Sequence, residues 1–248
     1  AECKSVRTAH RFSQGPRVYR RLIEKVTARR MYYFLRHGKL DLPYKDHSEM
    51  SFQVLADLAS EKLSPPIDEK KTRSLIDAIA VIIPLERLEK IYTSPSQRAR
   101  ETATLIADYT KERFQKESLI SVLPELREVH FDLREIYALS PQGIDIQAVN
   151  QAVFRATLSG KGAEPINSLY NRVDSIFKTL ANEERQEAAL ITHDFLMRAV
   201  ELYAEHKGIP RETTYEDLLQ TRRNSYLRGF AVQTVPWKFL PLEGGGAE

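Results

Sequence analysis

Short apolar runs alternate with longer segments of helical periodicity along most of the chain. Five runs are compact and rich in β-branched or aromatic residues, as buried strands are: 31–35, 88–92, 119–123, 188–192 and 226–235. Between and after them, apolar positions recur at helical spacing over 50–63, 71–83, 95–109, 146–158, 166–181 and 195–204. Strands separated by helices predict an α/β fold, specifically a three-layer α/β/α arrangement around a mainly parallel central sheet.

The pattern also divides the chain into unequal parts. Residues 1–30 form a basic N-terminal arm, in which 17–28 have the spacing of a short helix after Gly15-Pro16. Residues 31–240 form the main domain, with a partial helical cap predicted over 129–165, and 241–248 form a flexible tail around a Gly triplet. The arm carries nine basic and two acidic side chains, so its net charge is +7, against +3 for all 248 residues.

Composition narrows the class of protein. The chain is 42% hydrophobic and 29% charged, which is typical of a globular domain. Cys3 is its single cysteine, so an internal disulfide and a cysteine-based zinc site are excluded. No apolar run is long enough to span a bilayer. We expect a soluble, cytoplasmic protein with no membrane partner. Nucleic acid could bind only through the arm, which also resembles an organelle transit segment in its arginine content.

The residues directly after the predicted strands carry the candidate chemistry. In open α/β sheets, ligands bind beyond the carboxyl ends of the strands, so residues that follow different strands meet at one edge. In chain order, the groups that follow the first four strands are Arg36-His37-Gly38, Thr93-Ser94-Pro95 with Arg98 in the next helix, Glu125-Leu126-Arg127-Glu128, and Thr192-His193-Asp194.

This combination of side chains suits phosphoryl transfer. Arginine presents a planar fork of donors that matches phosphate oxygens. An imidazole can attack phosphorus and carry the phosphoryl group, and a second, protonated imidazole adds positive charge around it. A neutral carboxylic acid can protonate the leaving oxygen. Neither a P-loop nor a run of metal ligands accompanies these residues, so the expected reaction needs no metal and no cofactor.

The four motifs in this order resemble the histidine phosphatase superfamily, the group that includes cofactor-dependent phosphoglycerate mutases and many small-molecule phosphatases. The resemblance runs from about residue 31 to 235 and implies a phosphoglycerate mutase-like fold. It implies that His37 is the nucleophile and that Glu128 is the general acid. Arg36, Arg98 and His193 would bind the phosphate, and the Gly38 carbonyl would fix the tautomer of His37.

Departures from the family pattern leave alternatives open. Asp194 stands where a glycine is common, and the residues that mutases carry after the first motif are replaced by Lys39-Leu40-Asp41. A phosphatase is therefore favoured over a phosphomutase, while a non-catalytic regulatory protein that works through its basic arm is a third reading. Glu125 is the alternative acid, and Lys39 either binds phosphate or faces water. The long stretch 39–64 predicts an extra helix near the pocket mouth.

The expected ligand is a phosphorylated small molecule, with inorganic phosphate or sulfate able to occupy the same pocket. The sequence names neither the phosphate ester nor the oligomeric state. His10, His47 and His206 lie outside the motifs and are expected on the surface. His130 is expected to be a packed residue or a residue of the pocket rim rather than a catalytic one.

Overall fold

The computed structural model describes most of the main domain: residues 30–44, 49–138, 149–182, 187–221, 225–234 and 237–242. The predicted arm, its helix and the flexible tail lie outside these ranges, apart from Arg30 and residues 241–242, and so do His10 and His47.

A six-stranded sheet forms the centre, in the order β3-β2-β4-β1-β5-β6. Four neighbouring strands are parallel: β3 (Leu119–Val122), β2 (Lys90–Thr93), β4 (Glu187–Thr192) and β1 (Met31–Arg36). The last two, β5 (Gly229–Thr234) and β6 (Trp237–Pro241), extend the sheet with antiparallel pairing. The predicted α/β class with a mainly parallel sheet is confirmed. All five predicted strands are present, and β6 is an additional strand.

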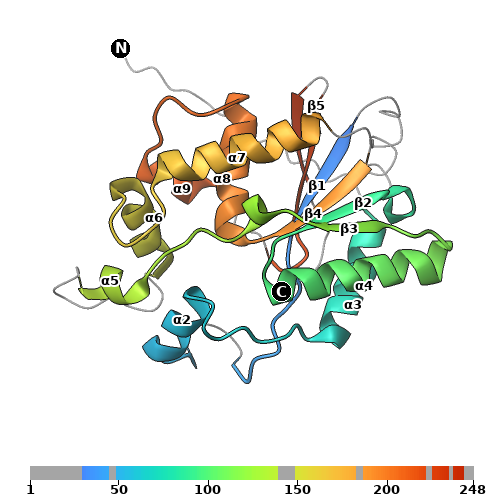
Figure 1. The fold of residues 1–248 in the computed structure, drawn as a ribbon, viewed down its shortest axis with the longest axis horizontal. Helices are drawn as coiled ribbons and strands as arrows, with labels where there is room; N and C mark the ends of the chain where they lie inside the picture. Colours follow the sequence, from blue (N-terminus) through green and yellow to red (C-terminus); the bar gives the residue numbers. More distant parts are fainter. Residues whose placement is uncertain are drawn as a thin grey trace, which may run out of the picture.

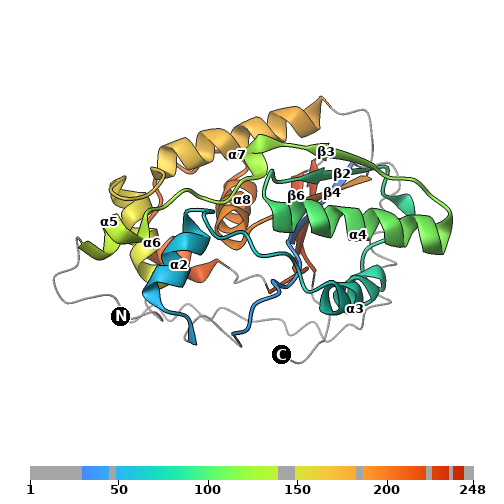
Figure 2. The ribbon, with the colours of Figure 1, turned by 60° about the horizontal axis from the view of Figure 1, so that its bottom comes forward.

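Helices cover both faces of this sheet, as Figures 1 and 2 show. On one side, α3 (Glu69–Ala80) and α4 (Gln97–Phe114) pack in a core that includes Tyr33 and Leu35. On the other side, α7 (Ile166–Ala181) and α8 (Asp194–His206) pack in a second core that includes Tyr32 and Phe34. Alternate residues of β1 thus enter opposite cores, because successive side chains of a strand point to opposite faces.

A group of shorter helices lies together at one end of the molecule: α2 (Phe52–Ala59), α5 (Leu133–Ala138), α6 (Val149–Ser159) and α9 (Tyr215–Gln220) (Figure 1). The helix predicted inside the 39–64 stretch corresponds to α2. Asp57 of α2 and Arg134 of α5 form an ion pair of 2.8 Å, which joins this insertion to the predicted cap. Two short 3₁₀ helices, η2 (Leu85–Arg87) and η3 (Pro124–Leu126), complete the described elements.

Helix α4 starts later than the sequence indicates. The sequence predicts helical spacing from residue 95, but α4 begins at Gln97 and the residue before it is Ser96. The Ser94 hydroxyl instead accepts a hydrogen bond from the Ser96 backbone N–H (3.3 Å) and contacts His193. Arg98 nevertheless lies in the first turn of α4, as predicted. Within the described residues, no helix combines the length and the apolar character needed to cross a bilayer.

Candidate active site

The pairing of β1 with β4 brings two histidines together. These strands are parallel neighbours in which Arg36 is the registered partner of Thr192, so the residues that follow them, His37 and His193, leave the sheet side by side. The His37 backbone N–H donates to the Thr192 carbonyl (2.9 Å), which extends the ladder by one bond. The two rings lie edge to face with centroids 5.2 Å apart. Both are buried, at 5% and 1% exposure.

The ring of His37 is held as a neutral imidazole with one nitrogen available. Its Nδ1 lies 2.8 Å from the Gly38 carbonyl oxygen, and only a protonated nitrogen can bond to a carbonyl, so Nδ1 carries the proton. Burial holds the pKa of His37 well below its usual value, and the charges of Arg98 and Arg36 lower it further. A neutral ring protonated on Nδ1 keeps the lone pair on Nε2, which is the form a nucleophile requires.

Gly38 is required here because there is no room for a side chain. A Cβ at this position would lie 2.5 Å from the hydroxyl oxygen of Thr72 on α3. The Gly38 N–H donates to the Thr102 hydroxyl (2.8 Å), which itself donates to the Arg98 carbonyl (2.6 Å). These bonds fix the turn that carries His37 against the first turn of α4.

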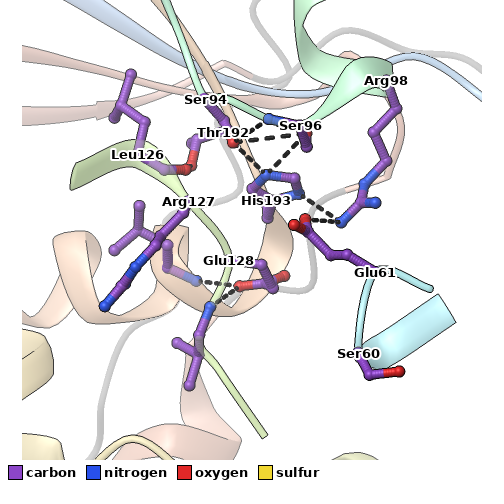
Figure 3. Close-up of polar contacts among 12 residues, drawn as sticks. Ser60, Glu61, Ser94, Ser96, Arg98, Leu126, Arg127, Glu128, Thr192 and His193 are labelled. Atoms are coloured by element: carbon purple, nitrogen blue, oxygen red, sulfur yellow. Dashed lines mark hydrogen bonds and ion pairs between the residues drawn. The ribbon is translucent and has the colours of Figure 1, made fainter. Parts of the chain in front are cut away.

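His193 is oriented through both ring nitrogens, as Figure 3 shows. Its Nδ1 accepts from the Arg98 guanidinium (3.4 Å), because arginine can only donate. Its Nε2 lies 2.9 Å from the Ser94 hydroxyl and therefore carries the proton of the neutral ring. Burial, Arg98 and His37 hold the pKa of His193 well below its usual value. The charges of Arg98 and Arg36 thus act against a further positive charge on this ring.

Two arginines border the histidine pair. Arg98 is 7% exposed, and its Nη2 lies 3.7 Å from the Glu61 carboxylate, which reaches in from the segment after α2 (Figure 3). The guanidinium carbon of Arg36 lies 4.5 Å from the ring centre of Tyr226, in a cation–π contact. The Tyr226 ring is also 5.7 Å from that of His37. Tyr226 was missed by the sequence analysis, which read it only as the start of a strand.

Glu128 is held by two backbone donors, one from the next residue in the chain and one from the first turn of α8. Its Oε1 accepts from the N–H groups of Val129 (2.9 Å) and Leu196 (3.1 Å). Burial raises the pKa of Glu128 above its usual value, although these N–H groups and Arg98 act in the opposite direction. A carboxyl group with a raised pKa can hold a proton at higher pH than an ordinary glutamate.

The two histidines, the two arginines, Glu61, Glu128 and Tyr226 all line one cavity of about 690 Å³. Arg36, His37, Arg98, Glu128 and His193 line it together, so five of the predicted site residues meet. His130 is exposed and lines the same cavity, which fits the rim position, one of its two predicted places.

The other candidates lie elsewhere. Lys39 and Glu125 are not among the residues that line this cavity. The Lys39 carbonyl accepts from the Asp68 N–H (2.7 Å) at the start of α3. A role of Lys39 in phosphate binding stays a prediction that the cavity lining does not support. Of the two candidate acids, Glu128 lines the cavity and Glu125 does not, so the geometry favours Glu128.

The donor set is one of guanidiniums and imidazoles. Among the residues that the structure describes, no group of three or more His, Cys, Asp or Glu side chains is arranged to hold a metal ion.

A cavity lined by two arginines and two histidines thus lies at the carboxyl edge of a mixed α/β sheet. The sequence model of the histidine phosphatase superfamily, branch 1, matches residues 32–216. The chain therefore belongs to this superfamily. No curated protein sequence matches it.

Solved structures with similar folds come from several organisms. A mycobacterial glucosyl-3-phosphoglycerate phosphatase is similar with a TM-score of 0.58 and 16% identity, over 87% of this chain and 100% of that one. A phosphoglycerate mutase from Bacillus anthracis gives 0.56 and 16%, over 87% and 92% of the chains. A phosphoserine phosphatase from Entamoeba histolytica gives 0.56 and 13%, over 88% and 98%. At such low identity these similarities establish the fold.

Proposed function

We propose that the protein is a phosphomonoester hydrolase that acts through a phosphohistidine on His37 without a metal ion. The observation that carries this proposal is the state of His37: its Nδ1 is tied to the Gly38 carbonyl, and its ring lies 5.2 Å from His193 beside two guanidiniums. A buried, neutral imidazole with a free Nε2 is a nucleophile, and arginines are the cations that phosphate oxygens prefer.

In the first half-reaction, Nε2 of His37 attacks phosphorus and the bond from phosphorus to the ester oxygen breaks. Glu128 gives its proton to the departing oxygen, so an alcohol leaves and a phosphohistidine remains. Arg36 and Arg98 bind the phosphoryl oxygens throughout. The negative charge of a bound phosphate favours a proton on His193, so the charged form of this ring belongs to the occupied site.

In the second half-reaction, water attacks the phosphohistidine. The Glu128 carboxylate accepts a proton from that water, the phosphorus–nitrogen bond breaks, and inorganic phosphate is released. His37 returns to its neutral state and Glu128 to its protonated state, so the cycle closes without a further reactant.

The test is to trap the intermediate with ³²P-labelled substrate, denaturing at alkaline pH because a phosphorus–nitrogen bond is labile in acid. We expect labelled protein from the wild type and none from His37→Ala, with turnover reduced by several powers of ten. His206→Ala removes an exposed histidine at the end of α8 and should label and turn over normally. Normal turnover by His37→Ala would overturn the proposal.

A second experiment distinguishes the proposed hydrolase from a phosphomutase, the second reading of the sequence. A mutase keeps the phosphoryl group on the enzyme until it passes to another hydroxyl, so little inorganic phosphate appears. On incubation with 3-phosphoglycerate and a bisphosphate primer we expect no interconversion of the phosphoglycerates, and interconversion without release of inorganic phosphate would overturn the proposal.

A further inference from the structure

The cavity is far larger than the phosphate group that its inner end fits. Its volume of about 690 Å³ lies within the range of pockets that enclose a drug-sized molecule, ~300–1,000 Å³. Most of the space therefore belongs to the group that carries the phosphate, and the side chains around it bear on the nature of that group.

About half of the side chains that line the cavity are apolar, and they come from two sides. The insertion supplies Leu55 and Leu58 from α2, and the segment after Glu128 supplies Phe131 and Leu133. Leu40, Ala59, Val129 and Val149 complete the apolar lining. Leu55, Val129 and Leu133 are buried, whereas Leu58 and Phe131 are partly exposed. Covering such partly exposed apolar surface with another apolar group is favourable.

The charged groups in the outer cavity are already engaged with one another. The Glu61 carboxylate lies 3.7 Å from Arg98, where it repels a second anion next to the phosphate. The Arg127 guanidinium is 3.7 Å from the Glu164 carboxylate. Glu164 in turn accepts from Arg172 at 2.6 Å. A leaving group with a carboxylate would have to compete with Glu164 for Arg127 and tolerate Glu61.

From this lining we infer that the preferred substrate is a phosphomonoester of an apolar alcohol, whose hydrocarbon part lies between α2 and the cap segment. This inference rests on the proposed function and adds to it the class of substrate. It excludes small anionic esters such as 3-phosphoglycerate as preferred substrates.

The test uses ethyl, butyl and hexyl phosphate, whose leaving alcohols have nearly equal acidity, so that only the buried hydrocarbon changes along the series. We expect kcat/KM to rise about two- to fourfold for each added methylene. We expect 3-phosphoglycerate to be used at least tenfold less efficiently than butyl phosphate. A flat or falling series, or a preference for 3-phosphoglycerate, would overturn the inference.

A pair of leucine variants tests the location. Leu58→Asn places an amide in the cavity wall and should flatten the chain-length dependence. Leu63→Asn changes an exposed leucine that is not among the lining residues, and the dependence should remain. If both variants keep the full dependence, the hydrocarbon does not lie against α2 and the inference fails.

A binding measurement separates this inference from the proposed function. Non-hydrolysable ethyl, butyl and hexyl phosphonates are titrated into the wild-type protein by calorimetry, and we expect the Kd to fall along the series with a negative heat-capacity change. Tighter binding of longer chains without any His37-dependent turnover would retain the ligand class and refute the hydrolase. Turnover that depends on His37 but shows no chain-length effect would retain the hydrolase and refute the apolar ligand class.

Discussion

His37 and His193 meet edge to face at 5.2 Å because each is the first residue beyond one of two registered strands. The site is therefore fixed by sheet register rather than by loop conformation. A shift of β4 along β1 would separate the two rings. It would also break the contacts with Ser94 and Arg98 that orient His193. The turn at Gly38 places the carbonyl that holds Nδ1 of His37. A change of the backbone at Gly38 therefore acts directly on the nucleophile.

Gly38→Ala should therefore damage both stability and activity. The added methyl group would meet the Thr72 side chain at 2.5–2.6 Å, closer than packed atoms allow. We expect a loss of ~1–3 kcal/mol in the free energy of unfolding, measured by urea denaturation. Activity should fall further than folding alone explains, because the Gly38 carbonyl would move away from Nδ1 of His37.

The matched control is the double variant with Thr72→Ala. Removal of the Thr72 hydroxyl and methyl groups opens the space that the new methyl group needs, so the loss for the double variant should be smaller than the sum of the two single losses. Strictly additive losses would show that the contact between Gly38 and Thr72 is not the cause.

The pH dependence of kcat/KM should be bell-shaped. His37 reacts when neutral, and its pKa is held well below 6.5 by burial and by Arg98 and Arg36, so the acidic limb lies at low pH. Glu128 reacts when protonated, and burial raises its pKa, so activity is lost as the pH rises through that raised value. Both shifts widen the interval in which the two groups are in their active forms.

Two glutamine variants assign the alkaline limb. Glu128→Gln should lower hydrolysis of butyl phosphate by ~10²–10⁴-fold and abolish that limb. Its burst of nitrophenolate from p-nitrophenyl phosphate should persist, because that leaving group needs no proton. Glu125→Gln should keep the wild-type profile, since Glu125 does not line the cavity. A limb that disappears in Glu125→Gln instead would exchange the two assignments.

The sequence predicted those parts of the molecule in which one pattern dominates. Buried strands such as β1 are short apolar runs, and the reactive residues follow them directly, so the edge that holds His37 and His193 could be inferred. The antiparallel β6 was missed because its five residues, Trp237–Pro241, form a short run that ends in proline. The helices α5 and α9 were missed because six residues show too little periodicity.

Features that depend on distant partners could not be predicted. Burial and the charge of Arg98 lower the pKa of His193, and both depend on how the connection from β2 to α4 packs against this ring. Tyr226 joins the site only because β5 pairs with β1, and no motif marks it. The same holds for Glu61, whose place beside Arg98 depends on how the insertion folds back over the pocket.

Glu61→Gln should strengthen phosphate binding. The Glu61 carboxylate competes with phosphate for Arg98, but it is 55% exposed, so the contact is weak and partly screened by water. We expect the inhibition constant of inorganic phosphate to fall about two- to fivefold, with a smaller effect at high salt.

Glu69→Gln provides the control for this variant. It removes an exposed acid that pairs with Arg73 on α3, outside the cavity lining, and should leave phosphate inhibition unchanged. Weaker phosphate inhibition in Glu61→Gln would mean that the carboxylate helps to position Arg98 rather than competing with its ligand.

Glu164→Gln should destabilise the fold in a pH-dependent way. Burial alone would raise the pKa of Glu164, but the bond from Arg172 and the charges of Arg172 and Arg127 hold it below the usual value. Arg172 also donates to the Glu125 and Arg127 carbonyls (2.8 and 2.6 Å), so this pair anchors the segment that carries Glu128.

With one partner gone, we expect a loss on the order of 3 kcal/mol at pH 7 in urea denaturation. A lowered carboxyl pKa stabilises the folded state above the unfolded pKa, and this contribution disappears as the pH falls through the folded value. The difference between wild type and variant should therefore shrink below about pH 4. Glu117→Gln, which breaks the exposed pair with Lys111, should cost at most ~1 kcal/mol. An equal loss in both variants would contradict the anchoring role of the buried pair.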